Sequence, residues 1–335
     1  MRSLVPSTSP FPGPTTATVE TWPGESPAAR MLAPALRNAT WLIRNTSGGP
    51  PVHKLLRFAG LSDFSVGLLQ PAPAGTTTTP VQFGGFTGEL VHGPGVTRDD
   101  GVVLYFHGGA FICCGLRSHR RLVARISAAS GLPVLNVDYR QLPAATLAQS
   151  IADCVHAYQL ALLRGYSADR IVFAGDSAGG YLAFATALRA VQQGLPAPAG
   201  IATLSPWLDL ECTHSLTHPN GLTDPYLPVR RIGQLLGLLY GNTDPVPPLV
   251  DSDLSGLPPT LIQVSSIEAL LPDAEIMTDK LAEHQVDVRL QVWEGQVHVF
   301  QAFADLVPEG FTAINQIGGF IAAQIGRVDQ SVSAA

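Results

Sequence analysis

The sequence predicts an α/β fold with a mostly parallel sheet, because short apolar segments alternate with helical ones from about residue 81 onward. Most of the apolar segments are continuous, such as Val102–Phe106 and Ile171–Ala174, as expected of strands that helices cover on both faces. The 335 residues are 46% hydrophobic and 14% charged, which supports a large buried core. Chemistry in such sheets lies at the carboxyl ends of the strands, so each candidate motif should follow a strand.

The alternation places the elements as follows. We expect strands at 81–91, 101–106, 133–138, 170–175, 200–204, 259–264 and 287–293. We expect helices at 117–130, 146–164, 178–193, 227–240, 273–285 and 308–325, and helical spacing of apolar residues also at 26–45 and 51–60. The Pro- and Thr-rich stretch 71–80 marks a boundary. The predicted domains are a flexible tail at 1–16, a helical cap at 17–75 that part of 205–255 would join, and a catalytic domain at 76–335.

Composition excludes several classes of partner. The net charge of −6 and the lack of a Lys/Arg cluster argue against nucleic acid. The four cysteines form no C-x-x-C pair, which favours a reducing, cytoplasmic compartment. The first 16 residues lack the apolar core of a secretory signal, and no apolar run is long enough to predict a membrane span.

One motif predicts a serine nucleophile. Residues 175–179 read Gly-Asp-Ser-Ala-Gly and match G-x-S-x-G, between the strand at 170–175 and the helix at 178–193. Strand, sharp turn and helix make a nucleophile elbow, in which larger flanking side chains would collide with strand or helix. The helix N-terminus would also stabilise negative charge beside Ser177. We therefore expect Ser177 to be the nucleophile, with a chance Gly-Ser turn as the alternative.

A second motif follows the strand at 101–106. Residues 107–111 read His-Gly-Gly-Ala-Phe and resemble an oxyanion loop of the HGGG type. Backbone donors held around a developing oxyanion contribute on the order of 3 kcal/mol each. Ala110 occupies the fourth position and keeps its N–H, although its methyl group narrows the approach. His107 precedes the serine in the chain, so we expect it to hold the loop rather than to act as a base.

The base is expected late in the chain, because this arrangement runs in the order Ser, Asp/Glu, His. His298 lies directly after the predicted strand at 287–293, which is the loop that a catalytic histidine should occupy. His284 falls within a predicted helix. His214 and His218 have the helical spacing of a metal pair but lack a well-placed acidic third ligand, so we expect no metal.

The acid that orients the histidine should also follow a strand. Glu268 comes shortly after the strand at 259–264 and is the predicted acid. Asp273 is the rival, although Leu271-Pro272 before it suggests that it caps the next helix.

These residues together resemble the hormone-sensitive-lipase-like esterases, the bacterial family IV group, over roughly residues 80–327. The resemblance implies an α/β-hydrolase fold with a mostly parallel eight-stranded sheet and a helical cap built largely from the N-terminal segment. It implies Ser177, Glu268 and His298 as the catalytic residues and an oxyanion hole at Gly108, Gly109, Ala110 and Ala178. Many members have Asp where this chain has Glu268, and the family's DYRLAPE reads Asp-Tyr-Arg-Gln-Leu-Pro-Ala here. The matching segments are 107–110, 138–140, 175–180, 205–210, 268–271 and 295–300.

The expected function is hydrolysis of short- to medium-chain carboxylic esters through a Ser-His-Glu triad and an acyl-enzyme, without metal or organic cofactor. The expected partner is a small ester, and the resemblance also suggests a homodimer. Trp207, Phe111, Phe58 and Leu61 would line the acyl pocket, with core packing as the equal alternative. An amidase or peptidase on the same triad, a non-catalytic binding protein of the same fold and a metal hydrolase stay as alternatives.

Overall fold

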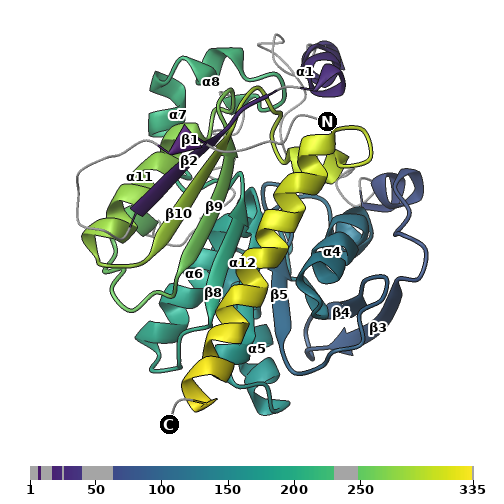
Figure 1. Ribbon diagram of the computed structural model, residues 1–335, viewed down its shortest axis with the longest axis vertical. Helices are drawn as coiled ribbons and strands as arrows, with labels where there is room; N and C mark the ends of the chain where they lie inside the picture. Colours follow the sequence, from purple (N-terminus) through teal and green to yellow (C-terminus); the bar gives the residue numbers. More distant parts are fainter. Residues whose placement is uncertain (1–6, 9–16, 25, 40–62, 230–247, 334–335) are drawn as a thin grey trace.

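The computed structural model describes residues 7–8, 17–24, 26–39, 63–229 and 248–333. One twisted sheet runs through the molecule and helices cover both of its faces (Figure 1). The strand order is β1-β2-β10-β9-β8-β7-β5-β6-β4-β3. The seven strands from β2 to β6 in this order run parallel, whereas β1, β4 and β3 pair antiparallel with their neighbours. The predicted α/β fold with a mostly parallel sheet is therefore confirmed.

The strands agree with the predicted ones to within a few residues in the catalytic domain. Their bounds are β1 Ser7–Thr8, β2 Ala17–Trp22, β3 Thr77–Gln82, β4 Thr87–His92, β5 Val102–Phe106, β6 Val134–Asp138, β7 Ile171–Asp176, β8 Gly200–Leu204, β9 Thr260–Ser265 and β10 Val288–Trp293.

The strand number is a correction: the described residues form ten strands and not eight. Residues 17–22, expected in the helical cap, instead form β2 and pair in parallel with β10, from Ala17 opposite Val288 to Trp22 opposite Trp293. Their β-branched and aromatic side chains suit a strand. The single strand expected at 81–91 is a hairpin of β3 and β4, because Gly84, with φ of 86°, allows the chain to reverse.

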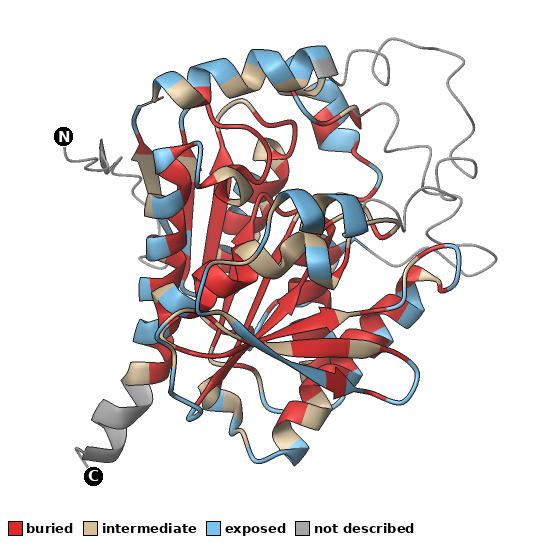
Figure 2. Cartoon of the chain, turned by 90° about the vertical axis from the view of Figure 1, so that its right-hand side faces the viewer, coloured by how far each residue is buried: buried red, intermediate tan, exposed pale blue. Residues whose placement is uncertain are grey.

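The helices form two layers. α4 (Leu116–Ser130) and α12 (Pro308–Ser333) cover one face, and α5 (Leu147–Leu163), α6 (Ala178–Gln192) and α11 (Leu271–Glu283) cover the other. Figure 2 shows the buried sheet between helices whose outer sides are exposed. The remaining helices are α1 Pro27–Ala39, residues 63–69, α7 Thr213–Thr217, α8 Asn220–Thr223 and the 3₁₀ turns η1 Ala168–Arg170, η3 Leu249–Asp251 and η4 Phe300–Phe303.

Successive residues of the central strands face opposite helical layers. In β5, Val103 and Tyr105 belong to the core under α4 and α12, whereas Leu104 and Phe106 belong to the core under α5, α6 and α11. All four are fully buried. This two-sided burial explains why the strand is apolar throughout instead of alternating with polar residues.

A third, smaller core joins the N-terminal segment to the end of the sheet. Trp22 of β2 stacks on Trp293 of β10 with ring centroids 4.7 Å apart, and Leu32 and Leu36 of α1 pack against the cluster that contains both rings. Phe300, two residues after His298, belongs to the same cluster. The helices expected at 51–60 and, from residue 230 on, at 227–240 lie outside the described residues.

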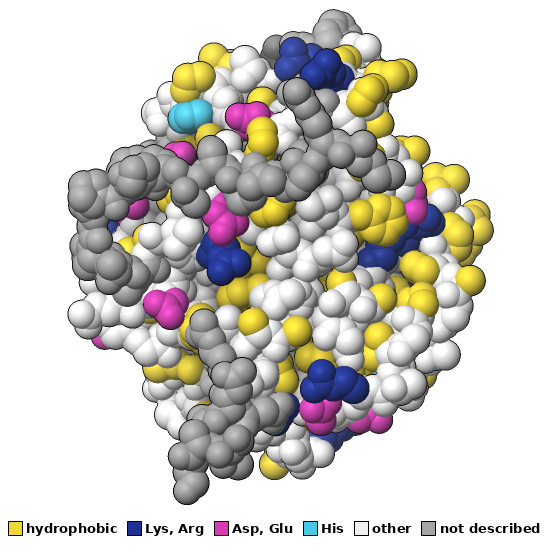
Figure 3. Space-filling view, in the orientation of Figure 1, with side chains coloured by type: hydrophobic (Ala, Val, Ile, Leu, Met, Phe, Trp, Pro, Cys, Tyr) yellow, Lys and Arg dark blue, Asp and Glu magenta, His cyan; other side chains and the backbone are white. Residues whose placement is uncertain are grey.

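The surface does not concentrate positive charge on the face drawn in Figure 3, where Lys and Arg side chains lie scattered among apolar and acidic ones. Among the described residues, no helix has the length and hydropathy needed to cross a membrane.

Truncation of the tryptophan stack should test whether β2 is an integral strand. Trp293→Ala removes a side chain that is 1% exposed, so the free energy of unfolding should fall by about 3–5 kcal/mol in urea titrations. Leu163→Ala, at a side chain that is 84% exposed, is the matched control and should change it by less than about 0.5 kcal/mol. Equal effects of the two substitutions would contradict this packing.

Candidate active site

The segment that joins β7 to α6 is a sharp elbow with Ser177 at its tip. Ser177 has φ of 52° and ψ of −119°, a conformation that non-glycine residues rarely adopt, and it directly precedes α6. Two backbone bonds fix the turn: Ser177 N donates to Leu204 O at 2.9 Å, and Trp207 N donates to Ser177 O at 3.0 Å. The serine is therefore held between the ends of β7 and β8.

The glycines of the motif allow this close packing. A Cβ on Gly175 would lie 2.3 Å from Gly179 O, and one on Gly179 would lie 1.8 Å from Phe106 O. Both oxygens belong to the backbone and cannot move aside as a flexible side chain could. Any residue larger than glycine would therefore force the strand and the helix apart. The sequence motif thus follows from the approach of α6 to β5 and β7.

Hydrogen bonds to buried side chains hold the loop after β5 in place. Gly108 N donates to Asp176 Oδ1 at 3.0 Å, so this amide points toward the carboxylate. No acceptor among the described residues bonds the amides of Gly109, Ala110 or Ala178. Of the four predicted oxyanion residues, Gly108 therefore differs from the others, and three amides stay available to a ligand.

His107 and Tyr139 hold the start of this loop. Tyr139 OH donates to His107 O at 2.8 Å, and the two rings stack with centroids 4.5 Å apart. Burial, with the nearby charge of His119, lowers the pKa of His107 to about 4, so its ring is neutral at physiological pH. This environment suits the holding role predicted for His107.

Asp176, the residue before the candidate nucleophile, is the centre of a buried polar cluster. Its carboxylate accepts bonds from Tyr105 OH at 2.7 Å and from Gly108 N, and His119 Nε2 lies 3.3 Å away. Burial alone would raise the pKa of Asp176, but the charge and hydrogen bonds of its partners outweigh it and lower that pKa to about 2. Burial alone would lower the pKa of His119, but the charge and hydrogen bond of Asp176 outweigh burial and raise that pKa to about 9. The two form an ion pair beneath the loop.

His298 and Glu268 come together at the ends of β9 and β10. His298 Nδ1 lies 2.7 Å from Glu268 Oε2, and both side chains are buried. Burial alone would lower the pKa of His298, but the hydrogen bond and charge of Glu268, together with Asp224 and Asp176, raise it above its usual value. The pair predicted from sequence is thus in direct contact.

Two serines anchor the carboxylate of Glu268. Ser205 Oγ donates to Glu268 Oε1 at 2.7 Å and accepts a bond from Val299 N, the residue after His298. Ser265 N donates to the same oxygen at 2.8 Å. Ser205 directly follows Leu204, which accepts the bond from Ser177 N, so the end of β8 contacts both the elbow and the histidine loop.

Sequence reasoning assigned no role to several residues around this pair. Asn220 Nδ2 donates to Ser266 O and Glu268 O, both at 2.9 Å, and Asp224 Oδ2 accepts from Ala269 N at 2.7 Å. The ring of Tyr226 stacks on His298 with centroids 5.8 Å apart. Ser205 and Asp176 lie inside sequence motifs that were already identified, so these motifs could have pointed to them. No sequence motif marks the other four residues, His119, Asn220, Asp224 and Tyr226.

The rival acid, Asp273, lies elsewhere. Its Oδ2 accepts bonds from Leu208 N at 3.0 Å and Asp209 N at 2.9 Å, and it makes no side-chain cap on its own helix. The expected capping role is therefore wrong, because the Asp273 carboxylate binds the backbone of Leu208 and Asp209 instead. Burial and the charge of Asp209 raise its pKa to about 7. The described residues include no contact between Asp273 and His298.

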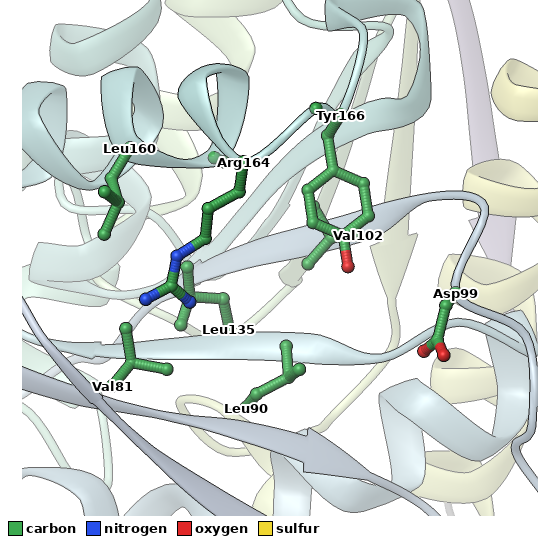
Figure 4. A pocket seen from close by; sticks show the side chains of 10 residues that line it. Val81, Leu90, Asp99, Val102, Leu135, Leu160, Arg164 and Tyr166 are labelled. Atoms are coloured by element: carbon green, nitrogen blue, oxygen red, sulfur yellow. The ribbon is translucent and has the colours of Figure 1, made fainter.

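The predicted pocket residues divide into two groups. Phe111 and Trp207 are fully buried with ring centroids 5.8 Å apart, and both belong to the core under α5 and α6. Phe58 and Leu61 lie outside the described residues. A hollow of about 440 Å³ elsewhere, near the amino end of β5, contains none of the candidate catalytic residues (Figure 4). It is lined by Val81, Leu90, Asp99, Val102, Leu135, Leu160, Ala161, Arg164, Gly165 and Tyr166.

The pH dependence of stability should report the buried ion pair. The pKa of His119 rises from 6.5 to about 9 on folding, so its contribution is complete below pH 6.5 and is lost as pH rises through about 9. His119→Gln should therefore remove part of the fall in unfolding free energy that urea titrations show over this range.

The wild-type protein is the control, and its unfolding free energy should fall more steeply between pH 6.5 and about 9 than that of His119→Gln. A His119→Gln protein with the wild-type slope would show that His119 is not an ionised partner of Asp176.

Comparisons with known proteins identify the family of this chain. A family model described as alpha/beta hydrolase fold matches residues 103–302. The carboxylesterase/phospholipase LipF of Mycobacterium tuberculosis is 42% identical over 274 residues, which is 78% of this chain and 73% of that protein. The esterase LipU of the same organism is 39% identical over 279 residues, 80% of this chain and 93% of that protein.

Solved structures give the same result. An esterase from the bacterial hormone-sensitive lipase family superposes with a TM-score of 0.80 at 35% identity, covering 90% of this chain and 100% of that chain. The crystal structure of EstE5 soaked by p-nitrophenyl butyrate superposes with a TM-score of 0.82 at 29% identity and the same coverage. The chain therefore belongs to the α/β-hydrolase fold family, in its group of hormone-sensitive-lipase-like esterases.

Proposed function

We propose that this carboxylesterase hydrolyses short- to medium-chain acyl esters through Ser177, His298 and Glu268 and a covalent acyl-enzyme. The observation that carries the proposal is the 2.7 Å contact between His298 Nδ1 and Glu268 Oε2. With Nδ1–H donated to the carboxylate, Nε2 is the basic nitrogen of the ring. The histidine is thereby prepared to accept a proton from a serine hydroxyl.

The reaction proceeds in two acyl transfers. His298 Nε2 takes the proton of Ser177, whose oxygen attacks the ester carbonyl, and the imidazolium then protonates the leaving alcohol. Water repeats the sequence on the acyl-enzyme and releases the acid. Glu268 orients the ring and stabilises its charged form throughout, and the steps use no metal or organic cofactor.

The amides of Gly109, Ala110 and Ala178 form the oxyanion hole in this proposal. Their lack of acceptors among the described residues supports it, because these N–H groups can then donate to the substrate oxygen. Gly108 acts differently, because its amide is bound to Asp176 and serves to position the loop. Ala178 is the first residue of α6, so the positive end of the helix dipole adds to the same site.

The acyl-length assignment rests on the family resemblance and on the relatives. EstE5 was soaked by p-nitrophenyl butyrate, a short acyl ester, and we extend that substrate class to this chain. The cytoplasmic location and the homodimer that the sequence suggests stay predictions.

Model esters test the activity and its alternatives. The purified protein should hydrolyse p-nitrophenyl butyrate faster than p-nitrophenyl palmitate and far faster than the matching anilide, because p-nitrophenolate is a much better leaving group than an anilide nitrogen. Ser177→Ala should lower kcat roughly a thousandfold or more. Ser167→Ala, an exposed serine, is the control with wild-type activity. Faster hydrolysis of the anilide than of the ester would favour the amidase alternative. A wild-type protein that hydrolyses neither substrate would favour the non-catalytic binding protein.

The two buried acids provide a matched comparison. Glu268→Gln should lower kcat roughly a hundred- to ten-thousandfold, because the amide no longer stabilises the imidazolium. Asp273→Asn keeps an oxygen that accepts the bonds of Leu208 N and Asp209 N, so kcat should stay within a few-fold of wild type. Steady-state kinetics with p-nitrophenyl butyrate measure both, and the reverse order of damage would overturn the acid assignment.

A further inference from the structure

Two adjacent cysteines follow the candidate oxyanion loop. Cys113 and Cys114 lie between Phe111 and the start of α4, both are half-buried, and neither is in a disulfide. Their sulfur atoms are 3.9 Å apart, close enough for one thiol to donate to the other. The mechanism proposed above uses neither side chain.

The first thiol helps to fix the peptide that carries an oxyanion donor. Gly109 O accepts three bonds, from Ile112 N at 3.0 Å, from Cys113 N at 3.1 Å and from Cys113 Sγ at 3.2 Å. In a planar trans peptide the carbonyl and the following N–H point in opposite directions. Holding Gly109 O on one side therefore aims the N–H of Ala110 toward the other.

The second thiol lies against the same loop. A Cβ on Gly109 would lie 3.1 Å from Cys114 Cβ, so this side chain packs beside Gly109. A group bound to the two sulfurs would therefore lie next to the peptide that joins Gly109 to Ala110.

We propose that Cys113 and Cys114 form a dithiol binding site for trivalent organoarsenicals, and that occupation of this site stops ester hydrolysis. In the binding step R–As=O condenses with the two thiols. Two S–H bonds and the As=O bond break, two As–S bonds form, and the oxygen leaves as water. Arsenic stays trivalent, so the step requires no oxidant or reductant.

Geometry favours this bridge over a direct disulfide. Neighbouring Cα atoms are about 3.8 Å apart, whereas disulfides usually join Cα atoms about 4.4–6.8 Å apart with sulfurs bonded at about 2.05 Å. An inserted arsenic atom lengthens the bridge by one atom and suits sulfurs that are 3.9 Å apart. The hydrogen bond to Cys113, with burial, also raises the pKa of Cys114, and peroxides react with thiolates rather than thiols.

Phenylarsine oxide tests the site by two independent readouts. Intact-mass spectrometry of the whole chain should show one adduct that survives dilution into 2-mercaptoethanol and is removed by 2,3-dimercaptopropanol. Hydrolysis of p-nitrophenyl butyrate should fall at least tenfold in parallel and recover with the dimercaptan. This second readout rests on the proposed function, whereas the mass readout does not.

Single substitutions separate this pair from the other thiols. Cys114→Ser and Cys113→Ser each leave only one sulfur of the pair. Neither variant should keep the adduct in 2-mercaptoethanol. The arsenical should also leave the activity of each variant equal to that of its own untreated sample. Cys212→Ser, in the buried core, should keep the wild-type adduct and inhibition. Should Cys113→Ser fail to fold, Cys114→Ser gives the same answer.

Two results would overturn the proposal. One is a monothiol-resistant adduct that persists in Cys114→Ser, which would place the arsenical elsewhere. The other is a stable adduct on a fully active wild-type enzyme, which would show that the dithiol is not coupled to the site. A wild-type protein that hydrolyses no ester would contradict the proposed function alone, and the adduct would still be measured.

Discussion

The buried carboxylate of Glu268 is the constraint on which the geometry of the site depends. It is fully enclosed and therefore has to be compensated within the protein, because an unpaired buried charge is strongly destabilising. Its partners are Ser205 Oγ, Ser265 N and His298 Nδ1, which lie at or just beyond the ends of β8, β9 and β10. One charge thus ties three neighbouring strand ends together, and the need to satisfy it places the histidine.

Local patterns were sufficient to predict the residues that lie on strand-to-turn junctions. Gly175, Ser177 and Gly179 identify the elbow because the approach of α6 to β5 excludes any Cβ at the two glycines. Glu268 and His298 follow from the rule that chemistry lies after parallel strands, and the structure brings them together. In these cases the packing of the folded chain restricts residues that are close together in the sequence. A short sequence motif is therefore enough to predict them.

Contacts between distant segments could not be read in this way. Asp176 and His119 are 57 positions apart in the sequence, and they pair only because α4 packs on the sheet. The sequence predicts the segment 17–22 to be part of the cap, whereas its pairing with β10 places Trp22 on Trp293. The sequence predicts Asp273 to cap its helix, yet its carboxylate binds the segment after β8. Each of these depends on which surfaces meet, and no local pattern encodes that.

The candidate oxyanion loop after β5 leaves backbone donors available without destabilising the fold. Ala110, with φ of 53°, and Cys114, with φ of 67°, adopt backbone conformations that cost non-glycine residues on the order of 1–3 kcal/mol each. The inner side of the loop offsets this strain, since Asp176 binds Gly108 N and three donors bind Gly109 O. Those bonds use the inward-facing groups of the loop, and peptide planarity then turns the N–H of Ala110 outward. Alanine at this position is consistent with a loop that is held by its neighbours rather than by glycine flexibility.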